Sequence, residues 1–184
     1  MVEYRLPNNL PTSSEAPIGY IGAANKRSTQ FEDVPNHMDF STSVCQVHTV
    51  KCGMNPLQPY LPGKACRSSG SGFAIKLANK IFFVTNHHVI DAGKRVQITL
   101  PHYGSQRFPV RIIADSPECD LTLLRIPGKH DVDVTPVPIG NSDAVTNGAK
   151  VIAVGYPLGQ DGLKITGGGK AGVQVMHGTE YIQT

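Results

Sequence analysis

Residues 70–93 read GSGFAIKLANKIFFVTNHHVIDAG and carry the clearest structural pattern in the chain. Apolar Phe73, Ile75 and Leu77 recur at every second position. This two-residue period predicts a strand with these three side chains on one buried face. Residues 78–80, which follow, predict a turn.

The chain continues with residues 81–85, a short apolar run that predicts a buried strand. Residues 86–93 are too few for a full helix and end at a glycine, which predicts a single helical turn. Similar strand patterns occur elsewhere in the chain, at residues 44–50, 95–100, 107–114, 120–126 and 149–156. Because the strands are short and no long helical pattern or internal repeat is present, we expect an all-β barrel or sandwich.

The predicted strands suggest how the chain is divided. Six of them, between residues 44 and 126, would suffice to close one small barrel, and the chain after about residue 135 would begin another. Residues 1–40 are rich in Pro, Asn and Ser and predict an extended or disordered arm. The chain has 184 residues, of which 40% are hydrophobic and 17% charged, which suits one ordinary domain or two small barrels.

Charge and hydropathy argue against several classes of protein. The net charge of +3 comes from 17 basic and 14 acidic residues, with no dense basic block, so nucleic-acid binding is not expected. No apolar run is long enough for a membrane span. Since the N-terminus shows no signal-peptide pattern, we expect an intracellular location in an unknown compartment.

The four cysteines, Cys45, Cys52, Cys66 and Cys119, form no C-x-x-C pair and have no histidine at zinc-finger spacing. We therefore interpret them as small, half-buried thiols, and we expect no metal site. A disulfide would fit poorly with an intracellular location.

Two residues are candidates for hydrolytic chemistry. His88 follows a buried strand at the start of a tight turn, where an imidazole can face a cleft; the alternative is a hydrogen-bonded surface histidine. Asp120 precedes an apolar strand, so its carboxylate should be partly buried and need a partner; the alternative is an ordinary turn aspartate. A serine protease needs such a pair together with a nucleophilic serine.

The motifs around these two residues resemble the Deg/HtrA type of trypsin-like serine protease. The matching segments, in the family's order, are residues 70–73 (GSGF), 84–90 (VTNHHVI), 119–124 (CDLTLL), 138–143 (PIGNSD) and 151–159 (VIAVGYPLG). The second matches T-N-x-H-V and places His88 in the catalytic position, with His87 at a variable one. The third matches the strand that carries the catalytic aspartate and assigns this role to Asp120.

The resemblance implies a chymotrypsin/trypsin-like double β-barrel over residues 41–184. The first barrel, at about 41–130, is expected to be complete, and the second, begun at about 135–184, incomplete. The implied function is that of a serine-type endopeptidase acting on unfolded polypeptides. It would need no cofactor, because triad hydrolysis uses side chains and water. Family members often add a PDZ domain and form trimers, so a homo-oligomer is compatible with the resemblance.

The chain departs from the family pattern at the nucleophile. The family's serine lies in G-N-S-G-G, whereas this sequence reaches Thr184 about where that segment should begin. Ser142, in GNSD, is rejected as nucleophile because Asp143 replaces the glycine and because Ser142 follows Asp120 too soon. We expect it to form a turn or a local cap.

Three interpretations follow for the whole protein. The first is an incomplete record of an active protease, in which case the 184-residue chain alone is inactive. The second is a pseudoprotease or a β-barrel module that binds peptides or a partner, and the third is a split enzyme completed by another chain. The glycine-dense segment 167–172 lacks the spacing of a P-loop and predicts a flexible turn.

Overall fold

The structure is a computed structural model that describes residues 2–4, 39–54, 62–128, 132–157, 160–176 and 179–184. Strands dominate it, so the fold is all-β, as expected. Most of the predicted N-terminal arm lies outside the described residues. Within residues 2–4, however, the chain forms a short strand, β1 (Val2–Tyr4), that pairs with a strand far along the sequence. No helix of the described residues is long and apolar enough to cross a membrane.

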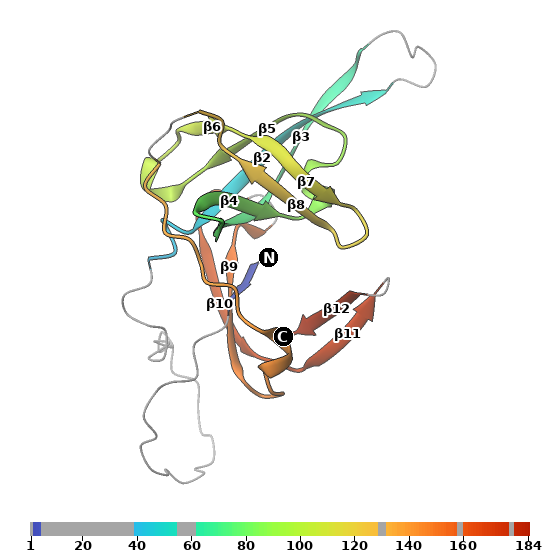
Figure 1. The fold of residues 1–184 in the computed structure, drawn as a ribbon. Helices are drawn as coiled ribbons and strands as arrows, with labels where there is room; N and C mark the ends of the chain where they lie inside the picture. The colour runs from blue at the N-terminus through green and yellow to red at the C-terminus, as the bar shows by residue number, and fades with distance from the viewer. Residues whose placement is uncertain (1, 5–38, 55–61, 129–131, 158–159, 177–178) are drawn as a thin grey trace, which may run out of the picture.

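The largest sheet has seven strands in the order β6-β5-β2-β3-β4-β8-β7, each antiparallel to its neighbours (Figure 1). The strands are β2 (Val44–Met54), β3 (Pro62–Leu77), β4 (Lys80–Thr85), β5 (Gly93–Thr99), β6 (Arg107–Pro109), β7 (Arg111–Ser116) and β8 (Leu121–Arg125). Only Val110 separates β6 from β7, and its N–H donates to the carbonyl of Val96 in β5 at 3.2 Å. The two ends of the sheet therefore belong to one bent strand, and the sheet closes into the first barrel.

Residues 70–93 form the β3–β4 hairpin and a helical turn. Ala78 and Asn79 have φ values of 46° and 61°, so both lie in the left-handed region. Two consecutive residues of this kind suit a tight hairpin whose twist matches its strands. The short helix α1 (His87–Ile90) directly follows β4 and Asn86. The predicted turn at 78–80 and helical turn within 86–93 are both confirmed.

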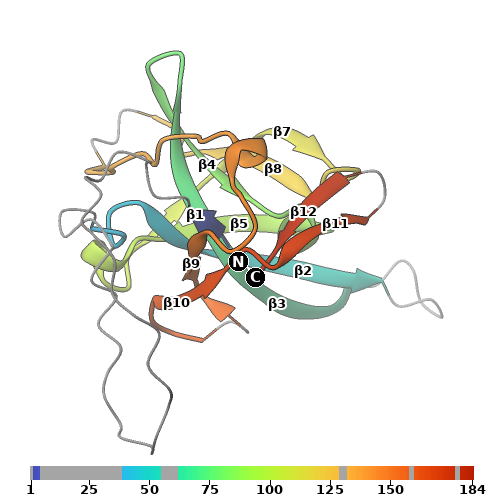
Figure 2. The ribbon, with the colours of Figure 1, turned by 90° about the horizontal axis from the view of Figure 1, so that it is seen from below.

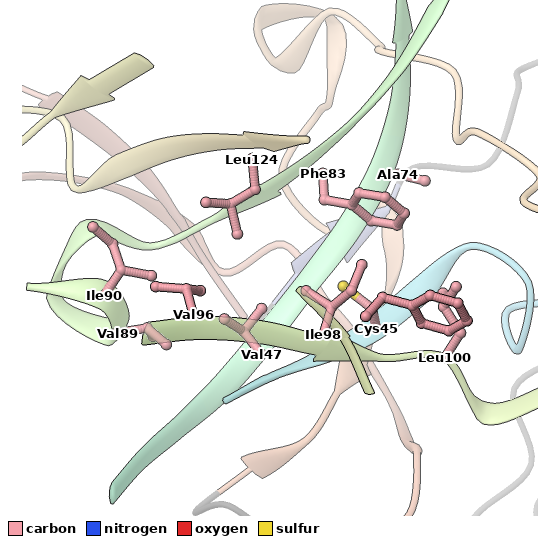
Figure 3. Close-up of a cluster of buried hydrophobic side chains, with 11 residues drawn as sticks. Cys45, Val47, Ala74, Phe83, Val89, Ile90, Val96, Ile98, Leu100 and Leu124 are labelled. Atoms are coloured by element: carbon pink, nitrogen blue, oxygen red, sulfur yellow. The ribbon is translucent and has the colours of Figure 1, made fainter. Parts of the chain in front are cut away.

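The barrel core is formed by side chains from nearly every strand. Figure 3 shows residues of β4 and β8 facing residues of β5. The buried cluster comprises Cys45, Val47, Ala74, Phe83, Val89, Ile90, Val96, Ile98, Leu100, Phe108 and Leu124. The prediction for β3 was wrong in part: Ala74 faces this core, Phe73 packs elsewhere, and Leu77 is 40% exposed. A strand covered on both faces places successive side chains in two different environments.

The second region contains two smaller sheets. A three-stranded sheet has the order β1-β9-β10, with β9 (Lys150–Gly155) and β10 (Lys164–Gly169), and β11 (Gly172–Met176) pairs with β12 (Thr179–Gln183). Two 3-10 turns complete the described elements, η1 (Pro101–Tyr103) and η2 (Ser142–Ala144). This second barrel is incomplete, as predicted.

The glycine-dense segment is a strand rather than the flexible turn that its composition predicted. Gly167, Gly168 and Gly169 form the end of β10, paired with Ile152, Val151 and Lys150 of β9. Glycine's local preference for turns is overridden here because the backbone groups bond to a neighbouring strand. Only residues 170–171 connect β10 to β11.

The two regions meet where β9 passes the barrel strands β2 and β3 (Figure 2). A second buried cluster joins them and consists of Phe40, Val44, Ile152, Val154 and Tyr156, with Phe73 and Leu163 packed against it. The Tyr156 N–H also donates to the Ser71 hydroxyl of β3 at 2.7 Å. Apolar packing and a buried hydrogen bond thus fix β9 beside the barrel.

Candidate active site

The two candidate residues come from neighbouring parts of the barrel. His88 lies in α1, directly after β4, and Asp120 lies at the end of the β7–β8 connection. Asp120 has a φ of 51°, in the left-handed region that Asp tolerates better than most residues. The pairing of β4 with β8 brings the two segments together, because Thr85 is the partner of Thr122.

His88 and Asp120 make a close pair. The His88 Nδ1 atom lies 2.7 Å from Oδ2 of Asp120, and the His88 backbone N–H donates to Oδ1 at 2.8 Å. Both carboxylate oxygens therefore bind the same histidine. The tautomer that carries its proton on Nδ1 leaves Nε2 as the basic nitrogen. The His88 side chain is 70% exposed, so a reacting group can approach it.

Asn86 is a further hydrogen-bond partner of Asp120. Its Nδ2 atom donates to both Oδ2 and the backbone carbonyl of Asp120, each at 3.2 Å. Partial burial by itself would raise the pKa of Asp120, but the hydrogen bonds from the His88 N–H and ring, its charge, and the Asn86 amide outweigh it. The pKa of Asp120 is therefore below its ordinary value, and the carboxylate stays charged at neutral pH.

His87 has a different partner. Its Nδ1 atom lies 2.9 Å from Oδ1 and 3.0 Å from Oδ2 of Asp115, near the end of β7. A shift of one position would have exchanged the roles of the two histidines. In the structure it is His88, as the sequence motif suggested, that pairs with Asp120.

A cavity of about 450 Å³ opens beside His88, between the two regions of the molecule. The barrel lines one side with residues of β3, Asn86 and α1, and β9 and β10 line the other. The lining residues are Ser69, Gly70, Ser71, Asn86, His88, Val89, Ala153, Gly155, Tyr156, Pro157, Lys164 and Thr166. A cavity formed by two structural units beside an exposed imidazole suits a substrate cleft.

The structure places Ser142 away from this cavity's described lining. Ser142 opens η2, on the connection between the barrel and β9. Here the Asn141 side chain accepts a hydrogen bond from the Asp143 N–H at 3.0 Å. Ser142 thus lies in a local turn, as expected.

Sequence reasoning missed two residues that support the site. Asn86 belongs to the T-N-x-H-V segment, so its position in that motif was the available signal. Lys51 of β2 donates from Nζ to the His88 carbonyl at 3.1 Å. No local pattern could have indicated Lys51, because it is 37 residues from His88 in the sequence.

Comparisons with known proteins agree with this geometry. The family model described as a trypsin-like peptidase domain matches residues 70–184. A probable serine protease do-like from Buchnera aphidicola is 30% identical over 142 residues, 74% of this chain and 28% of the relative. The periplasmic serine endoprotease DegP of Salmonella typhimurium is 30% identical over 62% of this chain and 24% of that protein.

Solved structures show the same fold. The HtrA-type protease AlgW with a tripeptide has a TM-score of 0.54 at 23% identity, and the match covers 72% of this chain and 37% of that one. The chain therefore belongs to the trypsin-like peptidase family and is of the Deg/HtrA type. It spans about a quarter of the length of the curated relatives it matches.

The relatives also correct the expected location. DegP of Salmonella typhimurium and DegP of Escherichia coli are both named as periplasmic endoproteases, which contradicts an intracellular assignment. That assignment rested only on the lack of a signal-peptide pattern in the first residues.

Proposed function

We propose that the protein is a serine endopeptidase in which His88 is the general base and acid and Asp120 is the group that orients it. The observation that carries this proposal is the 2.7 Å contact between His88 Nδ1 and Asp120 Oδ2, at the edge of a cavity. The nucleophilic serine lies outside these 184 residues, and the 184-residue chain alone does not hydrolyse peptides.

The roles follow from the geometry of the pair. Asp120 holds the Nδ1 proton, so Nε2 can take the proton of the serine hydroxyl as its oxygen attacks the peptide carbonyl. The imidazolium that forms is stabilised by the Asp120 carboxylate and then gives the proton to the departing amine. Water deacylates the enzyme by the same proton transfers in the second half of the reaction.

The substrate in this proposal is an unfolded polypeptide bound along the cavity between the barrel and β9–β10. The open cavity and the peptide complexes of the related AlgW protease support a peptide ligand. We also propose an extracytoplasmic site of action, a homo-oligomeric assembly, and a division into an N-terminal arm (1–40) and a protease domain (41–184). No nucleic acid takes part.

The first test is the intact mass and C-terminal sequence of the protein from its natural source, combined with labelling by a fluorophosphonate. The proposal expects a longer product that contains G-N-S-G-G and is labelled at that serine. His88→Ala should abolish turnover by this product, whereas His102→Ala should not, because His102 binds the Ser41 carbonyl in another part of the barrel.

Two results would overturn this assignment. A natural product ending at Thr184 would favour a pseudoprotease, or a split enzyme if a second polypeptide with G-N-S-G-G co-purifies. Turnover by the 184-residue chain that disappears in His88→Ala would contradict the proposed position of the nucleophile.

A further inference from the structure

A second histidine–carboxylate pair lies next to the candidate catalytic pair. His87 binds both oxygens of Asp115 through Nδ1, at 2.9 and 3.0 Å. The Thr122 hydroxyl donates to the same Asp115 Oδ1 at 2.5 Å. Asp115 and Thr122 are direct partners across β7 and β8, so the three groups form a continuous chain from the barrel to α1.

We propose that Asp115, held by Thr122, is a positioning residue that binds the His87 ring and thereby reserves Asp120 for His88. This inference rests on the proposed function, because it assigns a role to Asp115 only if the His88–Asp120 pair is catalytic.

Asp115 gives His87 a carboxylate partner of its own, so that the His87 ring does not compete with His88 for Asp120. His87 and His88 are adjacent, and the His87 backbone N–H already donates to the Asp120 carbonyl at 3.1 Å. The negative charge of Asp120 also acts on the His87 ring, although the Asp120 carboxylate is bound to His88. A His87 ring that turned to Asp120 would leave His88 without its orienting partner. A separate acceptor for His87 removes this competition.

The Thr122 hydroxyl fixes the position of the Asp115 side chain. The Thr122 side chain belongs to the barrel, and Thr122 is only 2% exposed, so its hydroxyl cannot move far. The His87 and Asp115 side chains are 22% and 33% exposed. A partly exposed ion pair by itself adds little stability, but a buried anchor gives this one a defined geometry.

The charges around His87 favour its protonated form. The hydrogen bond to Asp115 comes first among the causes that raise the pKa of His87, and the negative charges of Asp115, Asp91 and Asp120 add to it. The Asp91 Oδ1 atom lies 4.0 Å from His87 Nε2. From β2, Lys51 reaches the same helical turn and binds the His88 carbonyl.

The consequence for pH follows from the direction of these shifts. The pKa of Asp115 is lowered by the Thr122 hydrogen bond and then by the one to His87. Because the pKa of His87 is raised, the stability that its protonation contributes is fully present below the unfolded-state pKa of His87, as long as Asp115 is charged. This contribution is lost as the pH rises through the folded-state pKa of His87.

The spectroscopic test uses the 184-residue chain labelled with ¹⁵N at histidine, whose long-range ¹H–¹⁵N spectra report the tautomer of each ring. The wild-type chain should show His88 with its proton on Nδ1 once the ring is neutral. Asp115→Asn should lower the pKa of His87 and convert His88 to a mixture of tautomers. Thr122→Val should change the spectra in the same direction, and Thr122→Ser should restore them.

Asp91→Asn is the matched control, because it removes a carboxylate that also faces His87 but is farther from it. It should leave the His88 tautomer unchanged. A His88 spectrum that is the same in Asp115→Asn as in the wild type would overturn the proposal, since the pair would then be only a surface ion pair.

The kinetic test uses the natural, serine-bearing protein. Asp115→Asn should lower kcat about tenfold with little change in KM, because a misplaced base reacts more slowly without altering substrate binding. Full kcat in Asp115→Asn together with loss of activity in His88→Ala would reject the positioning role alone. Full activity in His88→Ala would instead reject the proposed function.

Discussion

The closed barrel and the β9–β12 region differ in how they bury their apolar side chains. In the barrel, Phe83 is 2% exposed and Ile98 and Leu124 are fully buried. In the second region, Ile152 and Val154 of β9 are buried against the barrel. Ile165 of β10 and Val173 and Val175 of β11, in contrast, are 50%, 47% and 62% exposed. A sheet that closes on itself covers its interior face and removes its edges, whereas short open sheets leave both available.

This difference agrees with where the proposed catalytic residues lie. His88 and Asp120 both belong to the barrel, together with Asn86 and Lys51 that hold them. The strands β9 and β10 contribute only walls of the cavity. Groups that must keep a fixed distance are best carried by the rigid part of a fold, and a cleft wall can be supplied by a second unit.

The largest effect should come from emptying the barrel core. Phe83→Ala removes a buried ring that packs within the core cluster, and we expect a loss of about 3–5 kcal/mol in the free energy of unfolding. Denaturant unfolding would measure this loss. Val175→Ala in β11 is the control and should change the free energy by less than about 0.5 kcal/mol. Equal losses in the two variants would remove the distinction between the regions.

A glycine pair offers a second test of the same contrast. A Cβ atom at Gly93 would collide with the Thr49 methyl group and would lie 2.6 Å from the Ile90 carbonyl. Gly93→Ala should therefore destabilise the barrel by about 1–3 kcal/mol. At Gly168 of β10 the nearest atom would be 3.9 Å away, so Gly168→Ala should be tolerated. Thermal unfolding of the two variants would show whether close packing is confined to the barrel.

Removal of one buried hydroxyl group should weaken the junction between the two regions. Ser71→Ala removes the hydroxyl that accepts the Tyr156 N–H and leaves that donor unpaired at a buried position. The cost should be about 1–2 kcal/mol. Hydrogen exchange should become faster at Tyr156 than at barrel amides such as Phe83, whereas Ser69→Ala in the same strand should leave both rates unchanged. Uniformly faster exchange would mean that the regions unfold as one unit.

The smallest effect concerns acid stability. Because hydrogen bonds hold the pKa of Asp120 below its ordinary value of 3.8, its contribution to stability is present above that value. The contribution is lost as the pH falls through the lower folded-state pKa. Asp120→Asn should therefore flatten the acid limb of the stability–pH curve. Asp143→Asn in η2 serves as the control outside the barrel, and an unchanged acid limb in Asp120→Asn would contradict the assigned hydrogen bonds.

Much of the architecture could be predicted from local sequence. The positions of most strands, the turn at residues 78–80 and the helical turn after Thr85 depend on neighbouring side chains, and they appear in the structure where they were expected. The buried face of β3 was predicted wrongly in part, because this strand is covered on both sides. The order and spacing of the His88 and Asp120 segments also indicated the family. These features are readable because short-range backbone preferences and burial patterns generate them.

Other features depend on contacts between segments far apart in the chain. The glycines of β10 form a strand because β9 supplies hydrogen-bond partners, and Phe73 packs beside β9 rather than inside the barrel. The pairing of His87 with Asp115 and of His88 with Asp120 exists because β4, β7 and β8 are neighbours. Which of two adjacent imidazoles binds a given carboxylate depends on their distances in the folded structure. No local pattern in the sequence determines those distances.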